Sequence, residues 1–147
     1  SLGLVHPQLD RDKINDRELS DSLFKIQKAL IILMGEISTA NDKKEDYRNK
    51  YDCLEKNDLT LVENIAERLI NDLEKENYEI KGWILYGSTN AAAAHLDFAS
   101  KVCREAELLI VELKDKGYEV RNSLIKYLNR LSDLLFIMAR YKEVIWN

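Results

Sequence analysis

Apolar residues recur every three or four positions in four long stretches of the chain, and this spacing is typical of amphipathic helices. The clearest stretch covers residues 120 to about 144, with an apolar stripe formed by Val120, Leu124, Leu128, Leu131, Leu134, Leu135 and Met138. Residues 17 to about 39 carry a second stripe, formed by Leu19, Leu23, Ile26, Leu30, Leu33 and Ile37. The pattern therefore predicts a long helix over each stretch.

The two remaining helical stretches lie between these two. Thr60 and Glu63 have the spacing of a capping box, which predicts the start of a helix whose inward residues are Leu61, Ile65, Leu69, Ile70 and Leu73. A fourth helix is predicted from residue 91 to about residue 116. Thr89 or Asn90 would cap its start, and Gly117 suits the position that follows its end.

The segments that join the helices are predicted from their polar residues and glycines. The polar run 40–57 indicates a solvated loop or an exposed helical turn. Residues 76–87 hold a short apolar run between Gly82 and Gly87, which indicates an extended connection laid over the core. Gly35 interrupts the first helix at a cost of about 1 kcal/mol relative to alanine, so we expect another helix to approach closely there.

Four long amphipathic helices without a credible strand predict an all-α fold, an up-and-down helical bundle of four to five helices. A chain of 147 residues is long enough for one domain with a substantial core but short for two. We therefore assign residues 1–147 to a single helical-bundle domain.

Composition and charge disfavour several functional classes. Charged residues are 33% and hydrophobic residues 46% of the chain, a balance typical of globular proteins. The net charge is −4 and no basic block occurs, which argues against nucleic acid as a partner. No apolar run approaches the roughly 20 residues of a membrane span, and no signal peptide is visible. Cys53 and Cys103 are isolated, which disfavours a disulfide framework or a zinc site, and the cytoplasm is the expected compartment.

The common metal and nucleotide motifs are missing from the sequence. His6 and His95 are the two histidines, and neither has a second ligand at helical spacing, so no metal site is expected. The paired Glu-x-x-His motif of a di-iron bundle does not occur. Glycine-rich phosphate loops and a local Ser-His-Asp signature are also missing.

The last predicted helix carries polar residues beside its apolar stripe. Asn129 and Asp133 are four residues apart and share a helical face, and Arg130 lies three residues before Asp133. Such residues need partners, because unpaired buried polar groups are costly. One interpretation is a network within this helix that joins Asn129 to Asp133 and Arg130. The alternative is that this face binds a ligand.

Three motifs occur in order along residues 17–142. The first is F-K-I-Q at 24–27, followed by Leu30, Gly35 and Thr39. The second is W-I-L-Y-G-S at 83–88, followed by alanines and by C-R-E-A-E at 103–107, and the third is N-R-L-S-D-L-L-F at 129–136. Together they resemble the I-Q-x-x-L…G, F-I-L-P-G-G…R-R-A-E and N-R-L-S-D motifs of ATP:cob(I)alamin adenosyltransferases of the propanediol-utilisation type.

The resemblance implies a fold, a reaction and a set of site residues. Such enzymes are ferritin-like five-helix bundles that assemble as homotrimers, and ATP (with Mg) and cobalamin meet between their subunits. The Co(I) ion attacks the 5′ carbon of ATP, which gives adenosylcobalamin and triphosphate. By motif position, Arg104 matches a catalytic arginine on the triphosphate, Glu107 matches the glutamate of the same motif, and Asn129 matches a nucleotide-contacting asparagine. Trp83 matches an aromatic residue that packs by the corrin.

The sequence departs from the family pattern at several positions. The T-G-D-x-G-x-T and D-E-L segments do not occur, and because the chain lacks an initiating Met, we expect a nucleotide-binding segment upstream of Ser1. A further family arginine is replaced by Ala99 or Ser100, depending on the alignment, and the R-R pair keeps one arginine, Arg104. Losing two cations weakens a triphosphate site by several kcal/mol, because charge-assisted hydrogen bonds contribute about 1.5–3 kcal/mol each. The expected fold is unaffected.

The site residues also have purely structural interpretations. Arg104 and Glu107 are three residues apart and could form an exposed ion pair on one helix, and Trp83 could simply pack in the core. For the whole chain, the alternative to an adenosyltransferase is a related bundle that binds cobalamin or a nucleotide without turnover, or an oligomeric scaffold.

The spacing around Gly117 gives one geometric prediction. Arg104 lies 13 residues before Gly117 and Asn129 lies 12 residues after it. In an antiparallel hairpin of helices both residues are then roughly 18–20 Å from the turn. Adjacent helix axes lie about 8–10 Å apart, so both side chains can reach one ligand if they face the same way. The family resemblance then implies that they converge on the ATP phosphates or ribose at a subunit boundary.

Overall fold

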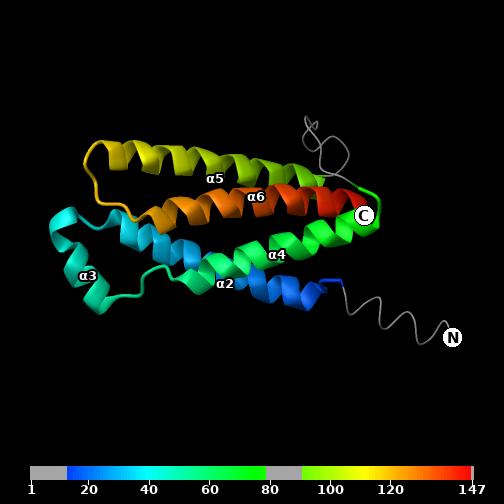
Figure 1. Cartoon of the computed structure of the whole chain (residues 1–147), viewed down its shortest axis with the longest axis horizontal. Coiled ribbons are helices and arrows are strands. Elements are labelled where there is room, and N and C mark those ends of the chain that lie inside the picture. The colour runs from blue at the N-terminus through cyan, green and yellow to red at the C-terminus, as the bar shows by residue number, and fades with distance from the viewer. Residues whose placement is uncertain (1–12, 79–90, 147) are drawn as a thin grey trace.

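The computed structural model describes residues 13–78 and 91–146. The described residues form α-helices and one 3-10 helix, without a strand, in the order α2 (Asp16–Ser38), η1 (Asn41–Lys43), α3 (Lys44–Lys50), α4 (Lys56–Lys75), α5 (Ala91–Asp115) and α6 (Asn122–Val144). Four of these helices are long and lie roughly side by side along the long axis of the molecule (Figure 1). The predicted all-α helical bundle is therefore confirmed.

Helix α6 is the centre of the bundle, because it packs against both α5 and α4, and α4 packs in turn against α2 (Figure 1). Its buried apolar residues are Leu124, Tyr127, Leu128, Leu131, Leu134, Ile137, Met138 and Tyr141. Their spacing of three and four residues places two adjacent stripes toward the neighbouring helices. The predicted stripe of this helix is largely confirmed, with Val120 and Leu135 partly buried against the same core.

Two polar contacts fix α6 against the neighbouring helices from opposite ends. Near its start, the Arg121 guanidinium bonds both carboxylate oxygens of Glu36 on α2 and donates to the Leu54 carbonyl at 2.8 Å. Near its end, the Tyr141 hydroxyl donates to the Asp72 carboxylate of α4 at 2.8 Å in the buried interior. These contacts supply partners for the buried carboxylates, as buried polar groups require.

The turn between α5 and α6 forms as the sequence predicts. Gly117 has a φ of 101°, a left-handed conformation that glycine adopts without steric cost. The Tyr118 amide donates to the Leu113 carbonyl at 3.1 Å and the Gly117 amide donates to the Lys114 carbonyl at 3.0 Å, which satisfies carbonyls at the helix end. The resulting tight hairpin sets α5 and α6 antiparallel.

The start predicted at Thr60 for the helix that contains Ile65 and Leu69 was wrong by about one turn. Helix α4 begins at Lys56, and its capping box consists of Glu55 and Asp58. The Glu55 amide donates to the Asp58 carboxylate at 2.8 Å. Thr60 lies inside the helix, where its hydroxyl donates to the Lys56 carbonyl at 3.1 Å. The Thr60–Glu63 spacing fits a capping box, but an earlier acidic pair satisfies the free amides first.

Gly35 permits the close approach that its position predicts. A Cβ atom at Gly35 would lie 2.3 Å from the Tyr47 hydroxyl oxygen. Tyr47 belongs to the short helix α3, so the polar run 40–57 contains helical turns, as one of the two interpretations expected. The predicted connection 76–87 lies largely outside the described residues, as do Trp83 and the caps Thr89 and Asn90.

Candidate functional site

Three of the four sequence-predicted site residues, Arg104, Glu107 and Asn129, lie where α5 and α6 pack together, and Trp83 lies outside the described residues. Five residues form what we call the α5–α6 polar cluster: Arg104, Glu107, Asn129, Arg130 and Asp133. Helix α5 contributes the first two and helix α6 the other three. Because the helices are antiparallel neighbours, residues on both sides of the hairpin face each other across the helix contact.

The Asn129 amide is held by contacts on both of its ends. Its Nδ2 donates to the two carboxylate oxygens of Glu107 at 3.3 and 3.4 Å. Its Oδ1 accepts a hydrogen bond from Arg130 Nη1 at 2.9 Å. Because an amide has distinct donor and acceptor ends, these partners fix which way Asn129 points.

Arg104 lies one turn from this amide and pairs with the same helix. Its Nη2 lies 3.8 Å from Asp133 Oδ1, and both side chains are 50% exposed. An ion pair that is this long and this exposed contributes little free energy. The Arg104 guanidinium is therefore open to an anionic ligand at small cost.

These contacts agree only in part with the structural interpretations of the sequence, since Arg130 bonds Asn129 within α6 as one of them expected. Glu107 bonds Asn129 rather than Arg104, and Asp133 pairs with Arg104 rather than with Asn129. The reason is the register of the hairpin, which sets 107 opposite 129 and 104 opposite 133. Arg104 and Asn129 thus lie within one helical turn of the same height, as the spacing around Gly117 predicts.

An open pocket of about 390 Å³ lies beside Arg104 on α5. Its lining residues are Ala94, Asp97, Phe98, Ser100, Lys101 and Arg104. Two of them, Lys101 and Arg104, are exposed cations, and Phe98 presents an exposed aromatic ring. Such a surface suits a ligand with an anionic part and a flat apolar part. Asn129 and Glu107 lie next to this pocket but do not line it.

A buried ion pair beneath this pocket was missed by the sequence reasoning. Arg140 is fully buried, and its Nη2 donates to Asp97 Oδ2 at 2.5 Å. Glu143 Oε2 lies 3.2 Å from Arg140 Nε, and the guanidinium carbon lies 4.8 Å from the centre of the Phe136 ring. Asp97 Oδ1 and Arg140 Nη1 have no hydrogen-bond partner among the described residues. The sequence feature that could have indicated this ion pair is Arg140 itself, which lies among the buried apolar positions of α6.

Two positions near Arg104 show how this chain differs from the family pattern. Ser100 is buried, and its hydroxyl donates to the Ser132 carbonyl of α6 at 2.7 Å. This hydrogen bond joins α5 to α6. Neither Ser100 nor Ala99 supplies the positive charge that the family arginine would bring to the pocket. Burial raises the pKa of the Cys103 thiol, so this residue favours the neutral form over a reactive thiolate.

Metal binding by protein side chains has no support in the described part of the chain. Across residues 13–78 and 91–146, no group of three or more His, Cys, Asp or Glu residues could hold a metal ion. None of the helices described is both long and apolar enough to cross a membrane.

Taken together, the described residues define a helical-bundle protein with an arginine-bearing, solvent-open pocket on one side of a helix hairpin. A family model with the description cobalamin adenosyltransferase matches residues 1–142. The chain belongs to this family, and the resemblance drawn from the three motifs is confirmed.

Individual relatives agree with the family match. A corrinoid adenosyltransferase of Citrobacter freundii is 32% identical over 126 residues, which cover 86% of this chain and 66% of that protein. A corrinoid adenosyltransferase of Bacillus subtilis is 31% identical, with 84% of this chain and 58% of the relative covered. The corrinoid adenosyltransferase MMAB of mouse is 40% identical over 75 residues, which cover 51% of this chain and 31% of the relative. The chain thus spans less than two thirds of the length of these relatives. No solved structure gave a significant match.

Proposed function

We propose that this chain transfers the 5′-deoxyadenosyl group of ATP to cob(I)alamin, giving adenosylcobalamin and triphosphate. The proposal is supported by family membership together with the position of Arg104. Its half-exposed guanidinium lines a pocket and lies within a helical turn of Asn129, the residue that matches the family's nucleotide-contacting asparagine.

The reaction requires charge stabilisation at the departing triphosphate. The Co(I) centre of the corrinoid substrate attacks the 5′ carbon, the bond from that carbon to the triphosphate oxygen breaks, and the electron pair leaves with triphosphate. The departing group therefore gains negative charge, which cationic donors stabilise. We assign this role to Arg104, with Lys101 as a second cation of the same pocket. Mg bound to ATP would neutralise further phosphate charge.

Glu107 has a positioning role in this proposal. Its carboxylate accepts from the Asn129 amide, so that the amide oxygen stays directed toward Arg130 and the amide nitrogen toward α5. Because these contacts already fix the Asn129 side chain, it loses little rotational freedom when the nucleotide binds, which reduces the entropic cost of binding. The role proposed for Trp83, an apolar contact to the corrin, concerns a residue outside the described part of the chain.

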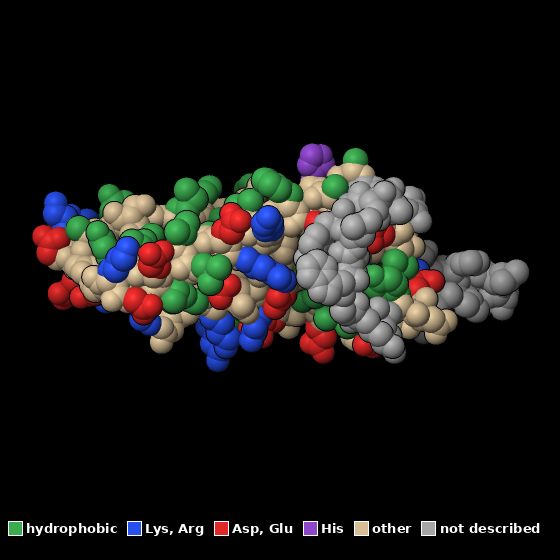
Figure 2. All heavy atoms as spheres, turned by 90° about the horizontal axis from the view of Figure 1, so that it is seen from above, with side chains coloured by type: hydrophobic (Ala, Val, Ile, Leu, Met, Phe, Trp, Pro, Cys, Tyr) green, Lys and Arg blue, Asp and Glu red, His purple; other side chains and the backbone are tan. Residues whose placement is uncertain are grey.

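We also propose a homotrimer in which the site is shared between subunits. The support comes from apolar side chains that the bundle leaves exposed. Helix α5 exposes Phe98, Val102, Leu108 and Leu109, and α2 exposes Phe24, Ile31 and Met34. Figure 2 looks onto the α5 side and shows apolar side chains along much of its length. Such surfaces are costly in a monomer and suit association with further copies. The cytoplasm is the proposed location, in keeping with two free cysteines.

The binding part of the proposal is tested by titrating ATP into wild type and Arg104→Gln and following heat and thermal melting. Loss of one charge-assisted contact should weaken ATP binding about 10- to 100-fold. Melting without ATP should be unchanged, because the Arg104–Asp133 pair is exposed and long. Arg17→Gln is the matched control, since Arg17 is an exposed arginine on α2.

Two results would refute this assignment of Arg104. One is an Arg104→Gln variant that melts earlier but binds ATP as wild type does, which would make Arg104 structural. The other is a wild-type chain that shows no ATP binding at millimolar ATP. Tight ATP binding without any adenosyl transfer would instead favour the alternative of a bundle that binds its ligands without turnover.

A further inference from the structure

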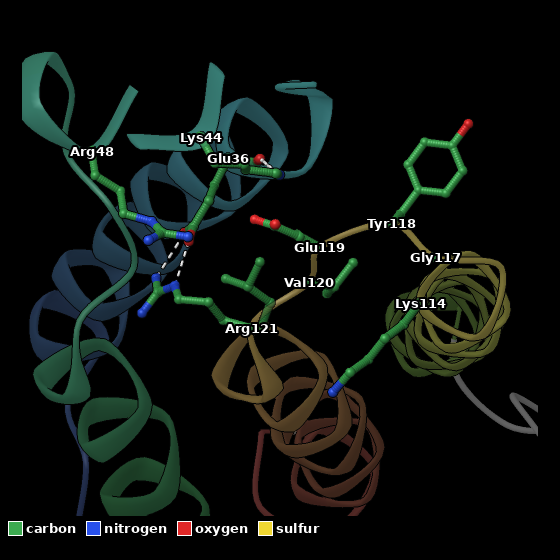
Figure 3. Close-up of a pocket in the computed structure, with 10 residues that line it drawn as sticks. Glu36, Lys44, Arg48, Lys114, Gly117, Tyr118, Glu119, Val120 and Arg121 are labelled. Carbon is green, nitrogen blue, oxygen red and sulfur yellow. Dashed lines mark hydrogen bonds and ion pairs between the residues drawn. The ribbon is translucent and has the colours of Figure 1, made fainter. Parts of the chain in front are cut away.

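A second polar pocket lies at the turn end of the bundle, away from the α5–α6 polar cluster. It has a volume of about 360 Å³ and is open to solvent. Its lining comes from α2, α3, the end of α5 and the turn before α6, and includes Gly117 (Figure 3). Arg104 lies 13 residues along α5 from Gly117, which is roughly 20 Å at the rise of a helix. The two pockets are therefore separate.

The charges around this pocket are unbalanced. Four cations line it, Lys44, Arg48, Lys114 and Arg121, against two carboxylates, Glu36 and Glu119, which leaves a formal surplus of two positive charges. The Glu36 carboxylate is already bonded by Arg121 on both of its oxygens. Lys114 donates to Asn122 rather than to either carboxylate. With Glu36 offset by Arg121, three cations remain against one carboxylate, Glu119. Of these three, Lys44 and Arg48 bond no side chain among the described residues.

Lys44 is a buried lysine with spare hydrogen-bonding capacity. Its side chain is among the buried polar groups, with 6% of its surface exposed. Its Nζ donates to the Glu36 carbonyl at 2.5 Å, while an ammonium group has three N–H donors. Burial lowers the pKa of Lys44, the Glu36 charge opposes this, and the Arg48 charge lowers the pKa further. An anion next to Lys44 would offset both the desolvation of its ammonium group and the repulsion by Arg48.

Arg48 provides a second set of unused donors close to Lys44. It makes no hydrogen bond or ion pair with the described residues, although a guanidinium carries five N–H groups in a planar fork. In Figure 3 the Arg48 side chain points toward the place where Glu36 and Arg121 meet. Two neighbouring cations with free donors match the several oxygens of a phosphate group.

We propose that this pocket binds the phosphate group of a small organic phosphate, with Lys44 and Arg48 as its ligands. The rest of the molecule would lie on the apolar lining, where Tyr118 is 57% exposed and Val120 and Leu124 form the wall. Glu119 points into the same space in Figure 3 and opposes an anion there. The site does not depend on the proposed adenosyl transfer.

The test is a titration of the protein with inorganic phosphate and with phenyl phosphate at constant ionic strength, followed by calorimetry and by backbone amide NMR shifts. Phenyl phosphate should bind more tightly than phosphate, and the largest shifts should fall at amides of the residues that line this pocket, Lys44 and Arg48 among them. Arg48→Gln should weaken binding about tenfold or more, and Glu119→Gln should strengthen it. Lys50→Gln on the same short helix, exposed and outside the pocket lining, should leave binding unchanged.

The variants also separate this site from the ATP pocket. Arg104→Gln should leave phenyl phosphate binding at this pocket unchanged. The proposal is overturned if neither probe binds at millimolar concentration, or if Arg104→Gln abolishes binding while Arg48→Gln does not. It is equally overturned if Lys50→Gln weakens binding as much as Arg48→Gln does, because the attraction would then be a general effect of surface charge.

Discussion

The buried ion pair of Arg140 with Asp97 should be among the most sensitive positions in the bundle. Arg140 is fully buried and Asp97 is 5% exposed, and their contact joins α6 to α5. Removing one partner of a buried ion pair leaves an uncompensated charge, at a cost of about 3–5 kcal/mol. For a chain of this size that corresponds to a melting temperature roughly 6–20 °C lower.

The two partners should not be equally costly to remove. Arg140 retains Glu143, whose Oε2 lies 3.2 Å from its Nε, and the Phe136 ring when Asp97 is changed to Asn. Asp97, in contrast, has no second cation at ion-pair distance among the described residues when Arg140 is changed to Met. We therefore expect Arg140→Met to cost about 3–5 kcal/mol and Asp97→Asn to cost less, about 1–3 kcal/mol.

Urea unfolding followed by circular dichroism measures these free energies, and a double variant provides the control. Replacing both partners with apolar residues, Asp97→Leu with Arg140→Met, removes the unpaired charge and should recover much of the loss of Arg140→Met alone. The reasoning is refuted if Arg140→Met costs under about 1 kcal/mol. It also fails if the double variant is less stable than Arg140→Met.

Three further predictions concern single positions in the bundle. Gly35→Ala should gain about 1 kcal/mol of helix propensity in a Tyr47→Phe background. In wild type that gain should be lost, because the new Cβ would lie 2.3 Å from the Tyr47 hydroxyl oxygen. Urea unfolding of wild type, the two single variants and the double variant tests this. Gly117→Ala should destabilise the α5–α6 turn by about 1–2 kcal/mol because φ is 101° there, and Gly117→Asn should cost less; equal melting temperatures would contradict it. Burial raises the pKa of Tyr127 and of Tyr141 above the usual 10.0, so the unfolded state ionises first and stability should fall as pH rises above 10. Tyr127→Phe should make that fall shallower in melting curves recorded between pH 8 and 11, and an unchanged slope would show that Tyr127 plays no part.

The sequence predicts the fold well because the helices are strongly amphipathic. The stripe of α6 could be identified from spacing alone, and the end of α5 followed from one glycine with a left-handed φ. The start of α4 could not be predicted, because its cap is an acidic residue, Glu55, whereas Thr60 offered the more familiar pattern. Local competition between two capping pairs depends on geometry that spacing does not specify.

The sequence predicted that Arg104 and Asn129 lie near each other, but it did not predict the contacts that they make. Helix rise placed Arg104 and Asn129 at similar heights, but rise says nothing about rotation around each helix axis. The register that pairs Glu107 with Asn129 and Arg104 with Asp133 emerges only from the packed hairpin. The buried Arg140 was missed because arginine in a helix is normally solvent-exposed, and its partner comes from another helix.

The central claim, adenosyl transfer to a corrinoid, is tested most directly by one anaerobic turnover measurement. Cobalamin is reduced to cob(I)alamin by a chemical reductant, ATP and Mg are added, and adenosylcobalamin and triphosphate are quantified together, using the protein as its gene encodes it. The account predicts equal amounts of both products, with the rate lowered at least tenfold in Arg104→Gln and unchanged in Arg17→Gln. It is contradicted if ATP and cob(I)alamin remain unchanged with the wild-type protein, or if triphosphate forms without adenosylcobalamin.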